Sequence, residues 1–332
     1  MSRLNIGVVG VGHLGALHAK MLVNIDSAKL VGVYDSNHER ALKIAEEFQL
    51  KAYHSYEELL RETDAVTIAV NTKAHYEVAI QALQAGKHIF IEKPITETIK
   101  QAEELINLSK QKKLKIQVGH IERFNPALLA VEHIKLAPLF IESHRLAQFN
   151  PRGSDVAVVH DLMIHDIDII LSLVKSPVEQ VFANGVAVIT DTIDIANARI
   201  QFANGCIANV TASRISKSKM RKMRLFQKDA YISLDFNEGN AEIFRLVDAS
   251  EVGQSVPDVL GMFNLETLNK KIVYEKPKKN EINALKHELE LFIDAIVNHK
   301  TPQVTAEDGL RALEVAQMIV DKISSQQPFY KI

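Results

Sequence analysis

Residues 4–15 read Leu4-Asn5-Ile6-Gly7-Val8-Val9-Gly10-Val11-Gly12-His13-Leu14-Gly15, and residues 16–22 continue in a helical pattern. A short β-branched apolar segment thus runs directly into a Gly-x-Gly-x-x-Gly turn. Gly10 permits a tight turn, Gly12 lets the backbone approach a pyrophosphate, and Gly15 lets helix and strand pack closely. N–H groups at the helix start then face the phosphates. The spacing predicts a dinucleotide-binding turn, to which His13 and Leu14 also contribute; an ordinary glycine turn is the alternative.

Length and composition bound the fold and its partners. A chain of 332 residues suggests two domains, and a formal charge of −2 gives no reason to expect nucleic acid or an anionic membrane as partner. Cys206 is the single cysteine, which excludes an intramolecular disulfide and a cysteine-built zinc site. The first strand starts within about five residues of Met1 and no long apolar run follows, so we expect a soluble cytoplasmic protein.

Strand and helix patterns alternate from residue 4 to residue 118. This alternation predicts a doubly wound parallel sheet with helices on both faces, and ligands in such a sheet bind beyond the carboxyl ends of the strands. We expect this dinucleotide-binding domain over residues 1–119. After the first strand, further strands are expected at Leu30–Tyr34, Ala65–Val70, His88–Ile91 and Lys115–Val118, with helices at 39–48, 56–61, 74–85 and 98–112.

Polar residues after these strands are candidate cofactor contacts. Asp35 ends the second long strand, where a carboxylate can accept hydrogen bonds from both adenosine ribose hydroxyls. It would repel a 2′-phosphate, which favours NAD, although Arg40 could soften that preference and leaves NADP open. A turn-forming aspartate is the alternative. Asn71, Thr72 and His75 are expected near the nicotinamide half of the cofactor, with Thr72 as helix cap and a packing or capping role as the alternative for His75.

Glu92 and Lys93 follow the strand at residues 88–91 directly. A lysine at the carboxyl end of a sheet strand, before Pro94, is well placed to reach a substrate hydroxyl. A positively charged nicotinamide nearby would lower the pKa of Lys93 and aid proton transfer. Glu92 is expected to contact the cofactor and Lys93 to contact both cofactor and substrate. A plain surface lysine is the alternative.

A second domain is expected over residues 120–332. Its C-terminal segment, 283–325, should form two helices, at 283–298 and 306–324, that pack back on the first domain. Residues 160–168 are predicted to form a helix with Asp161, His165 and Asp168 on one face. An aspartate beside a histidine can orient its ring and raise its basicity, so we expect Asp161 and His165 to bind substrate and His165 to accept a proton. A metal site is the alternative; no metal is expected, because no second ligand cluster stands out.

Alternating apolar patterns after this helix predict an antiparallel sheet. The expected strands are Val178–Val188, Ile193–Phe202, Cys206–Ser213, Met223–Gln227, Ala230–Asp235 and Ala241–Leu246. Asn204-Gly205 predicts a hairpin turn between two of them. A broad sheet with an apolar face invites a partner copy. Residues 248–280 are expected to form loops around a short helix.

Further polar residues are candidate substrate contacts. Arg123 and Asn125 could line the substrate site, or else be a salt-bridged arginine and a helix-capping asparagine. Basic residues also gather at Arg214, Lys217, Lys219, Arg221, Lys222 and Arg224. This cluster indicates either a strand edge protected by lysines or arginine recognition of a diphosphate, with Arg214 as a substrate contact.

The combination of the glycine turn, Asp35, Glu92-Lys93-Pro94 and Asp161-x-x-x-His165-x-x-Asp168 resembles the Gfo/Idh/MocA family, relatives of glucose-fructose oxidoreductase and inositol dehydrogenase. The resemblance covers essentially the whole chain. It implies a Rossmann domain and a C-terminal α/β domain with a large open, mainly antiparallel sheet, commonly the interface of a homodimer or homotetramer. It also implies that Lys93 contacts the reacting hydroxyl and that the next peptide bond is often cis. Asn71 departs from the family, which often has proline there, and puts that loop's conformation in question.

Residues 119–126, 161–168 and 211–214 resemble the subgroup that includes UDP-N-acetylglucosamine 3-dehydrogenases. The expected function is therefore NAD-dependent oxidation of a secondary sugar hydroxyl, the 3-hydroxyl of a UDP-linked N-acetylhexosamine. Lys93 and His165, supported by Asp161, would take the hydroxyl proton. Two alternatives remain open: a dehydrogenase of a free sugar, inositol or sugar acid, and a cofactor-binding regulator without turnover.

Overall fold

The computed structural model describes residues 3–150, 156–248, 259–265, 270–279 and 281–326. The chain divides into two compact units. The first consists of residues 1–121 and 283–313, and the second of residues 122–282 and 314–332. Within the described ranges, no helix is both long enough and apolar enough to cross a membrane.

The first unit is built on a six-stranded parallel sheet in the order β3-β2-β1-β4-β5-β6. Its strands are β1 (Leu4–Val9), β2 (Ala28–Tyr34), β3 (Lys51–Ala52), β4 (Ala65–Ile68), β5 (His88–Glu92) and β6 (Ile116–Gly119). The order reverses at β1, so the carboxyl ends of β1 and β4 flank the point where doubly wound sheets bind ligands. This is the parallel sheet that the sequence predicts.

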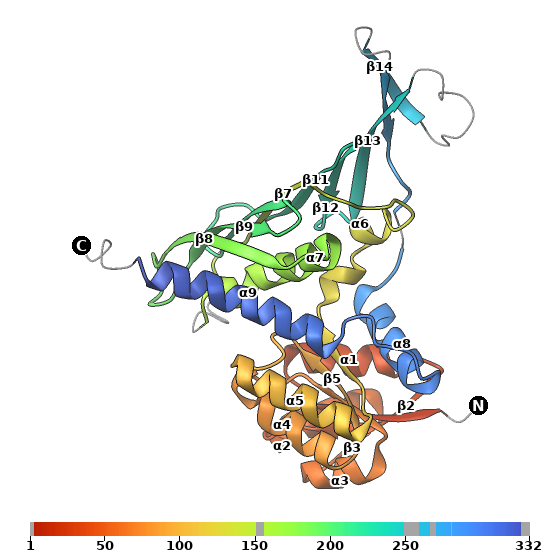
Figure 1. The fold of residues 1–332 in the computed structure, drawn as a ribbon. Helices are drawn as coiled ribbons and strands as arrows, with labels where there is room; N and C mark the ends of the chain where they lie inside the picture. The colour runs from red at the N-terminus through yellow and green to blue at the C-terminus, as the bar shows by residue number, and fades with distance from the viewer. Residues whose placement is uncertain (1–2, 151–155, 249–258, 266–269, 280, 327–332) are drawn as a thin grey trace. The chain divides into compact units, whose positions relative to one another are not determined.

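Helices cover both faces of this sheet (Figure 1). They are α1 (His13–Leu22), α2 (His38–Phe48), α3 (Tyr56–Glu62), α4 (Thr72–Gln84), α5 (Ile99–Lys112) and α8 (Ala284–Val297). Ile6 and Val8 share one core with α1, α2 and α8, in which Phe292 is fully buried. Gly7 points the opposite way, and a Cβ there would lie 2.7 Å from Leu59 of α3. The late helix α8 therefore completes the core of the first unit.

Helix α9 (Ala306–Ser324) is shared between the units at Leu313. Thr305 caps it, since its hydroxyl accepts from the Asp308 N–H and the Asp308 carboxylate accepts from the Thr305 N–H, at 3.1 and 3.0 Å. The sequence led us to expect the whole helix with the first domain. Its second part instead belongs with the second unit, where Ile323 lies beside Gly185.

The second unit holds a nine-stranded, mainly antiparallel sheet in the order β14-β15-β13-β12-β11-β7-β10-β9-β8. Its strands are β7 (Phe140–Leu146), β8 (Val178–Val186), β9 (Ile195–Phe202), β10 (Ile207–Ser213), β11 (Met220–Phe226), β12 (Ala230–Asp235), β13 (Asn240–Asp248), β14 (Val259–Leu265) and β15 (Lys270–Glu275). Gly205, at φ +85°, forms the predicted hairpin between β9 and β10. Among the described strands of this sheet, β7 and β10 pair in parallel and the other neighbours are antiparallel.

Two features of this sheet differ from the expectation. Within residues 248–280, the described part contains the strands β14 and β15 in place of the expected loops and contains no helix; residues 249–258, 266–269 and 280 lie outside the described residues, and the expected short helix is not tested there. Strand β7 was not expected at all, because charged and polar residues interrupt its apolar alternation. Its inward side chains are nevertheless buried, as Ile141 and Ser143 show at 0 and 1 % exposure.

Candidate active site

The glycine turn after β1 has the geometry of a phosphate cradle. Gly10 adopts φ +80°, and a Cβ at Gly15 would lie 1.8 Å from the Gly10 carbonyl oxygen, so helix and turn meet backbone to backbone. A Cβ at Gly12, the N-cap of α1, would meet no atom within 4 Å. No side chain caps α1, which leaves its first N–H groups for an anion. The open space beside Gly12 fits the pyrophosphate of a dinucleotide.

Asp35, directly after β2, is buried and held in one orientation. Its Oδ2 accepts the Val11 N–H at 2.8 Å and its Oδ1 accepts the Asn37 N–H at 2.9 Å. The exposed Arg40 guanidinium lies 3.4 Å from Oδ2. The carboxylate is thereby tied to the glycine turn itself. Its remaining lone pairs suit ribose hydroxyls, and a nearby arginine suits a 2′-phosphate.

The loop after β4 is fixed by a buried histidine. Asn71, and not Thr72, is the N-cap of α4, so the expected cap is one residue late. The two ring nitrogens of His75 lie 2.8 Å from the Pro94 carbonyl oxygen and 3.2 Å from the Val70 carbonyl oxygen. Burial lowers the pKa of His75, against the opposing effect of these carbonyls. His75 thus holds the β4 loop to the segment after β5, which is the packing alternative from the sequence.

The carboxyl end of β5 carries a hydrogen-bonded histidine–glutamate pair next to Lys93 in the chain. Glu92 Oε1 lies 2.9 Å from Nε2 of His18 on α1, and the two side chains are 12 and 1 % exposed. The Lys93–Pro94 peptide bond is cis, as the family resemblance implies. Lys93 itself is half-buried. The sequence names Glu92 as a cofactor contact but contains no signal for its pairing with His18, which is 74 residues away.

In the second unit, the predicted site helix is a π-helical turn, Val159–Met163, followed by α7, Ile164–Val174. Asp161 and His165 are half-buried, whereas Asp168 is 1 % exposed. The apolar side chains Met163, Ile167, Ile170 and Val174 of this segment are buried. π-Helical turns are frequent at functional sites. Asp161 and His165 therefore share the accessible side of this segment, and Asp168 does not.

Buried ion pairs hold α7 to the sheet. Arg145 of β7, 2 % exposed, donates to Asp166 on α7 at 2.8 Å and to Glu122 at 2.8 Å. Both carboxylates raise the pKa of Arg145, against the lowering effect of burial. Removing one partner of such a buried pair costs about 3–5 kcal/mol, because the other charge stays buried. Sequence reasoning missed Arg145 together with its strand.

Arg123 and Asn125 belong to the same network. Arg123 donates two hydrogen bonds to Asp168, at 2.7 and 2.6 Å. Asn125 is the N-cap of α6 (Pro126–Leu129), and its Nδ2 donates to Glu122 at 3.0 Å. These contacts match the alternatives that the sequence left open, a salt-bridged arginine and a capping asparagine. A substrate contact by either residue stays a prediction.

Arg214 is buried, at 4 % exposure. Its Nη2 donates to the carbonyl oxygens of Val156 and Ile193, and its Nε lies 3.7 Å from Asp194. Oδ2 of Asp194 in turn accepts three consecutive N–H groups from residues 188–190. These backbone bonds bring the pKa of Asp194 down to about 2, although burial alone would raise it. Arg214 thus holds the segment before the π-helical turn, and its expected contact with substrate stays a prediction.

The rest of the basic cluster is split between the two faces of the sheet. Strand β11 lies inside the sheet, between β12 and β7, so the strand-edge interpretation is wrong. Arg221 pairs in register with Arg145, on the face that α7 covers, and lies 3.4 Å from Glu122. Lys222 and Arg224 lie on the opposite face, where they pair with Asp235 and Glu142.

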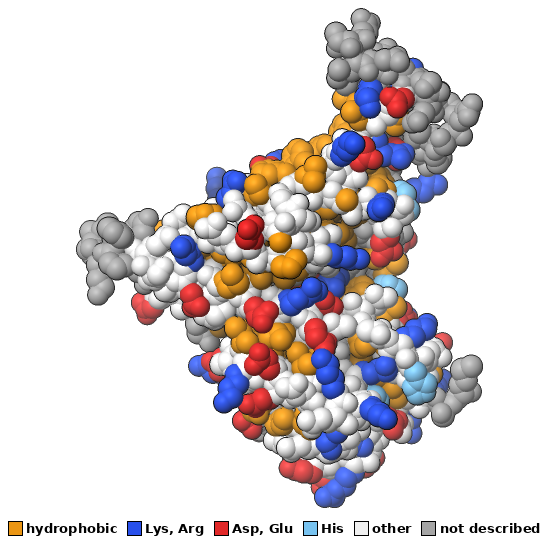
Figure 2. Space-filling model, in the orientation of Figure 1, with side chains coloured by type: hydrophobic (Ala, Val, Ile, Leu, Met, Phe, Trp, Pro, Cys, Tyr) orange, Lys and Arg blue, Asp and Glu red, His pale blue; other side chains and the backbone are white. Residues whose placement is uncertain are grey.

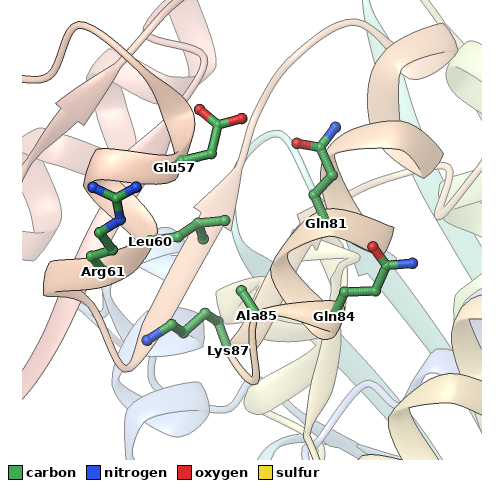
Figure 3. Close-up of a pocket in the computed structure, with 7 residues that line it drawn as sticks. All are labelled: Glu57, Leu60, Arg61, Gln81, Gln84, Ala85 and Lys87. Atoms are coloured by element: carbon green, nitrogen blue, oxygen red, sulfur yellow. The ribbon is translucent and has the colours of Figure 1, made fainter.

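The described residues differ in what they offer to metals and to small molecules outside the glycine turn. No group of three or more metal-ligating side chains is found among them. An open pocket of about 500 Å³ lies between α3 and α4 (Figure 3). Arg61 at the end of α3, Gln84 at the end of α4 and Lys87 just before β5 line it. These residues mark the amino end of β5, whereas the glycine turn follows the carboxyl end of β1, so this pocket is not the cofactor cradle.

The cradle at Gly12, the oriented Asp35 and the sheet order define a dinucleotide-binding enzyme with a lysine at the carboxyl end of β5. Comparison with known families agrees. The model described as "Oxidoreductase family, NAD-binding Rossmann fold" matches residues 4–120, and that of the GFO/IDH/MocA C-terminal domain matches residues 142–233. The chain belongs to the Gfo/Idh/MocA family and is an NAD-binding oxidoreductase.

Individual relatives cover almost the full chain. A UDP-N-acetylglucosamine 3-dehydrogenase from Acidithiobacillus ferrooxidans is 37 % identical over 320 residues, 96 % of this chain and 97 % of the relative. A solved structure of that enzyme has a TM-score of 0.87, with 98 % of this chain and 99 % of the other covered at 36 % identity. A myo-inositol 2-dehydrogenase from Thermotoga maritima is 25 % identical over 329 residues, 93 % of each chain.

Substitution of Gly12 by alanine tests the cradle. We expect Gly12→Ala to keep the melting temperature of the wild type, because the added Cβ meets no protein atom. We expect it to weaken NAD binding at least about tenfold, because one or two charge-assisted hydrogen bonds to the pyrophosphate would be lost. Calorimetric titration with NAD and a thermal unfolding scan measure the two effects. Gly15→Ala is the contrasting variant, since its Cβ would clash with the Gly10 carbonyl and lower the melting temperature. Unchanged NAD affinity in Gly12→Ala would contradict the cradle.

Proposed function

We propose that this chain oxidises the 3-hydroxyl of a UDP-linked N-acetylhexosamine with NAD as hydride acceptor. The observation that carries the proposal is the 37 % identity with a UDP-N-acetylglucosamine 3-dehydrogenase over 96 % of the chain. A free polyol is the second candidate, because a myo-inositol 2-dehydrogenase matches at 25 % identity. Fold alone does not distinguish the two substrates.

The residues of the first unit suit alcohol oxidation. NAD, when bound, supplies a nicotinamide carbon that accepts the hydride. The Gly12 cradle would hold the pyrophosphate of the cofactor, and Asp35 would hold its adenosine ribose. Lys93, directly after β5, would accept the hydroxyl proton as the carbon–oxygen bond becomes a carbonyl. In the second unit, His165 with Asp161 is proposed as the alternative acceptor of that proton, and both side chains are half-buried there.

A substrate panel with a lysine variant tests this function. With NAD, we expect an increase in NADH absorbance with UDP-N-acetylglucosamine and none with free hexoses or myo-inositol. Lys93→Ala should bind NAD normally and lose at least about a hundredfold in kcat, the usual scale of general-base catalysis. Lys100→Ala, on an exposed lysine of α5 in the same unit, is the matched control. Turnover of myo-inositol alone would overturn the nucleotide-sugar proposal.

Arg221 is the proposed contact for the diphosphate. Of the basic cluster on β11, it lies on the face that α7 covers, and 44 % of its side chain is exposed. Glu122 holds the guanidinium from one side and is itself held by Arg145. An arginine fixed in this way can still offer N–H groups to phosphate oxygens. Arg214 is buried and bonded to the carbonyl oxygens of Val156 and Ile193, so it would have to break those bonds to reach a phosphate.

Substitution of Arg221 tests whether its guanidinium contacts the diphosphate of a UDP-sugar. We expect Arg221→Ala to raise the KM for a UDP-sugar about tenfold or more, the loss of one charge-assisted hydrogen bond, with a much smaller effect on kcat. Steady-state kinetics measures both. Lys222→Ala is the matched control, because its side chain is 45 % exposed on the opposite face of the same strand. An equal effect of the two substitutions would argue against a diphosphate contact at Arg221.

The uncovered face of the nine-stranded sheet is the proposed interface with a second copy of the chain. Aromatic side chains form a continuous row across five strands of this face, with ring centroids 4.8–5.8 Å apart: Phe140, Phe226, Tyr231, Phe244 and Tyr274. Figure 2 shows hydrophobic side chains gathered along the margin of the second unit, over the region labelled β7 and β11 in Figure 1. Exposed aromatic rows of this kind are typical of protein interfaces.

A charge placed in this row tests the interface. Phe226 lies between Phe140 and Tyr231 and is 37 % exposed. We expect Phe226→Glu to reduce the particle mass in light scattering from that of a dimer or tetramer to that of one chain, because a carboxylate would be buried at the interface. Val297→Glu, at a similarly exposed position on α8, should leave the mass unchanged. A wild-type chain that is already a monomer contradicts the proposal outright.

A further inference from the structure

The strongest unassigned feature of the first unit is the buried pair of His18 and Glu92 at the end of β5. His18 lies on α1, five residues after the helix start that follows the glycine turn. Its Nε2 is 2.9 Å from Glu92 Oε1. An ionised carboxylate can only accept, so the Nε2–H donates. The proposed mechanism uses neither side chain, yet Glu92 is the residue directly before Lys93.

The ring of His18 and the carboxylate of Glu92 are both locked by packing. His18 stands edge-on to the fully buried Phe90, with centroids 5.3 Å apart and an interplanar angle of 77°. Glu92 pairs in register with Gly119 of β6, where a Cβ would lie 3.0 Å from the carboxyl carbon. A larger residue at position 119 would push the carboxylate out of place. The pair therefore has one geometry, set by three elements.

Charges around Glu92 keep it ionised. Burial raises its pKa, but the His18 hydrogen bond and the charges of His18, Lys93 and His75 outweigh burial and hold the pKa below its usual value. These groups come from α1, from the chain after β5 and from α4. On the β6 side, the titratable residue next to Gly119 is His120, which is also buried. Glu92 thus brings one fixed negative charge next to Lys93.

This fixed charge matches the charge change of the proposed reaction. NAD, when bound, would bring one positive charge, and Lys93 would have to be deprotonated to accept a proton. The substrate carbon would give up its C–H electron pair as hydride to the cofactor, the O–H proton would pass to the Lys93 nitrogen, and the C–O bond would become a carbonyl. The positive charge has then moved to Lys93, where a nearby carboxylate stabilises it as it develops. A fixed anion inside the protein stabilises a nearby positive charge more strongly than an anion in water does, because the effective dielectric constant is lower.

We infer that the His18–Glu92 pair positions a buried anion that sets the pH at which Lys93 takes up its proton. Glu92 acts on Lys93 through its charge, and His18 acts by orienting Glu92. Both are positioning residues. The inference rests on the proposed function only for its role in catalysis, because the effect on Lys93 can be measured without any substrate.

Labelling of Lys93 provides that substrate-free measurement. The full chain is treated with acetic anhydride across a pH series, and the acetylated fraction of the peptide containing Lys93 is quantified by mass spectrometry. In Glu92→Gln, which keeps the shape and loses the charge, we expect the midpoint for Lys93 to move about one pH unit lower, the usual size of a neighbouring-charge effect. Glu104→Gln removes an exposed carboxylate of α5 that accepts from the Tyr76 hydroxyl, and it should leave the midpoint unchanged.

A second pair of variants keeps the test decisive if Glu92→Gln unfolds. His18→Gln keeps a donor toward Glu92 and should hold the midpoint near that of the wild type. His18→Phe removes the donor, lets Glu92 move or protonate, and should shift the midpoint downward. Midpoints that are identical in wild type, Glu92→Gln and His18→Phe would overturn the inference. A chain that shows the shifts but oxidises no sugar would overturn the proposed function and leave the inference standing.

Discussion

The backbone contact between Gly15 and the Gly10 carbonyl is the constraint on which the first unit depends. It sets the direction in which α1 leaves the turn, and no side chain can be inserted there. Along α1, that direction exposes N–H groups at the open side of Gly12 and, one turn further, brings His18 to the end of β5. The phosphate cradle and the surroundings of Lys93 are therefore both consequences of one turn.

In the second unit, the accessible candidate residues lie on a helical segment that is otherwise buried, so that segment must be held in place by buried contacts. Asp166 and Asp168 would be costly inside the protein without partners, and Arg145 and Arg123 supply them. Arg214 fixes the chain just before the π-helical turn. These buried contacts determine which polar residues of the helix, Asp161 and His165, remain within reach of solvent.

Much of the first unit could be predicted from sequence, since its glycine turn and strand runs are local patterns. The buried Asp35 after β2 and the lysine after β5 followed from position in such a sheet. The second unit was harder. Strand β7 carries Glu142, Ser143 and His144, so it lacks the alternation that marks a strand, and the pairing of its Arg145 depends on tertiary contacts. The backbone contacts of Arg214 were not predicted, because a buried arginine and a ligand-binding arginine look alike in sequence. The His18–Glu92 contact spans 74 residues and leaves no local signal.

Deuterium at carbon 3 of UDP-N-acetylglucosamine tests the proposed chemistry most directly. The purified chain is incubated with the labelled sugar and NAD, and the NADH formed is analysed by mass spectrometry. Direct hydride transfer from carbon 3 predicts NADH that carries the deuterium, together with slower turnover than with the unlabelled sugar. NADH without the label would contradict oxidation at carbon 3, and NAD binding without any NADH from this sugar would contradict a UDP-N-acetylglucosamine dehydrogenase altogether.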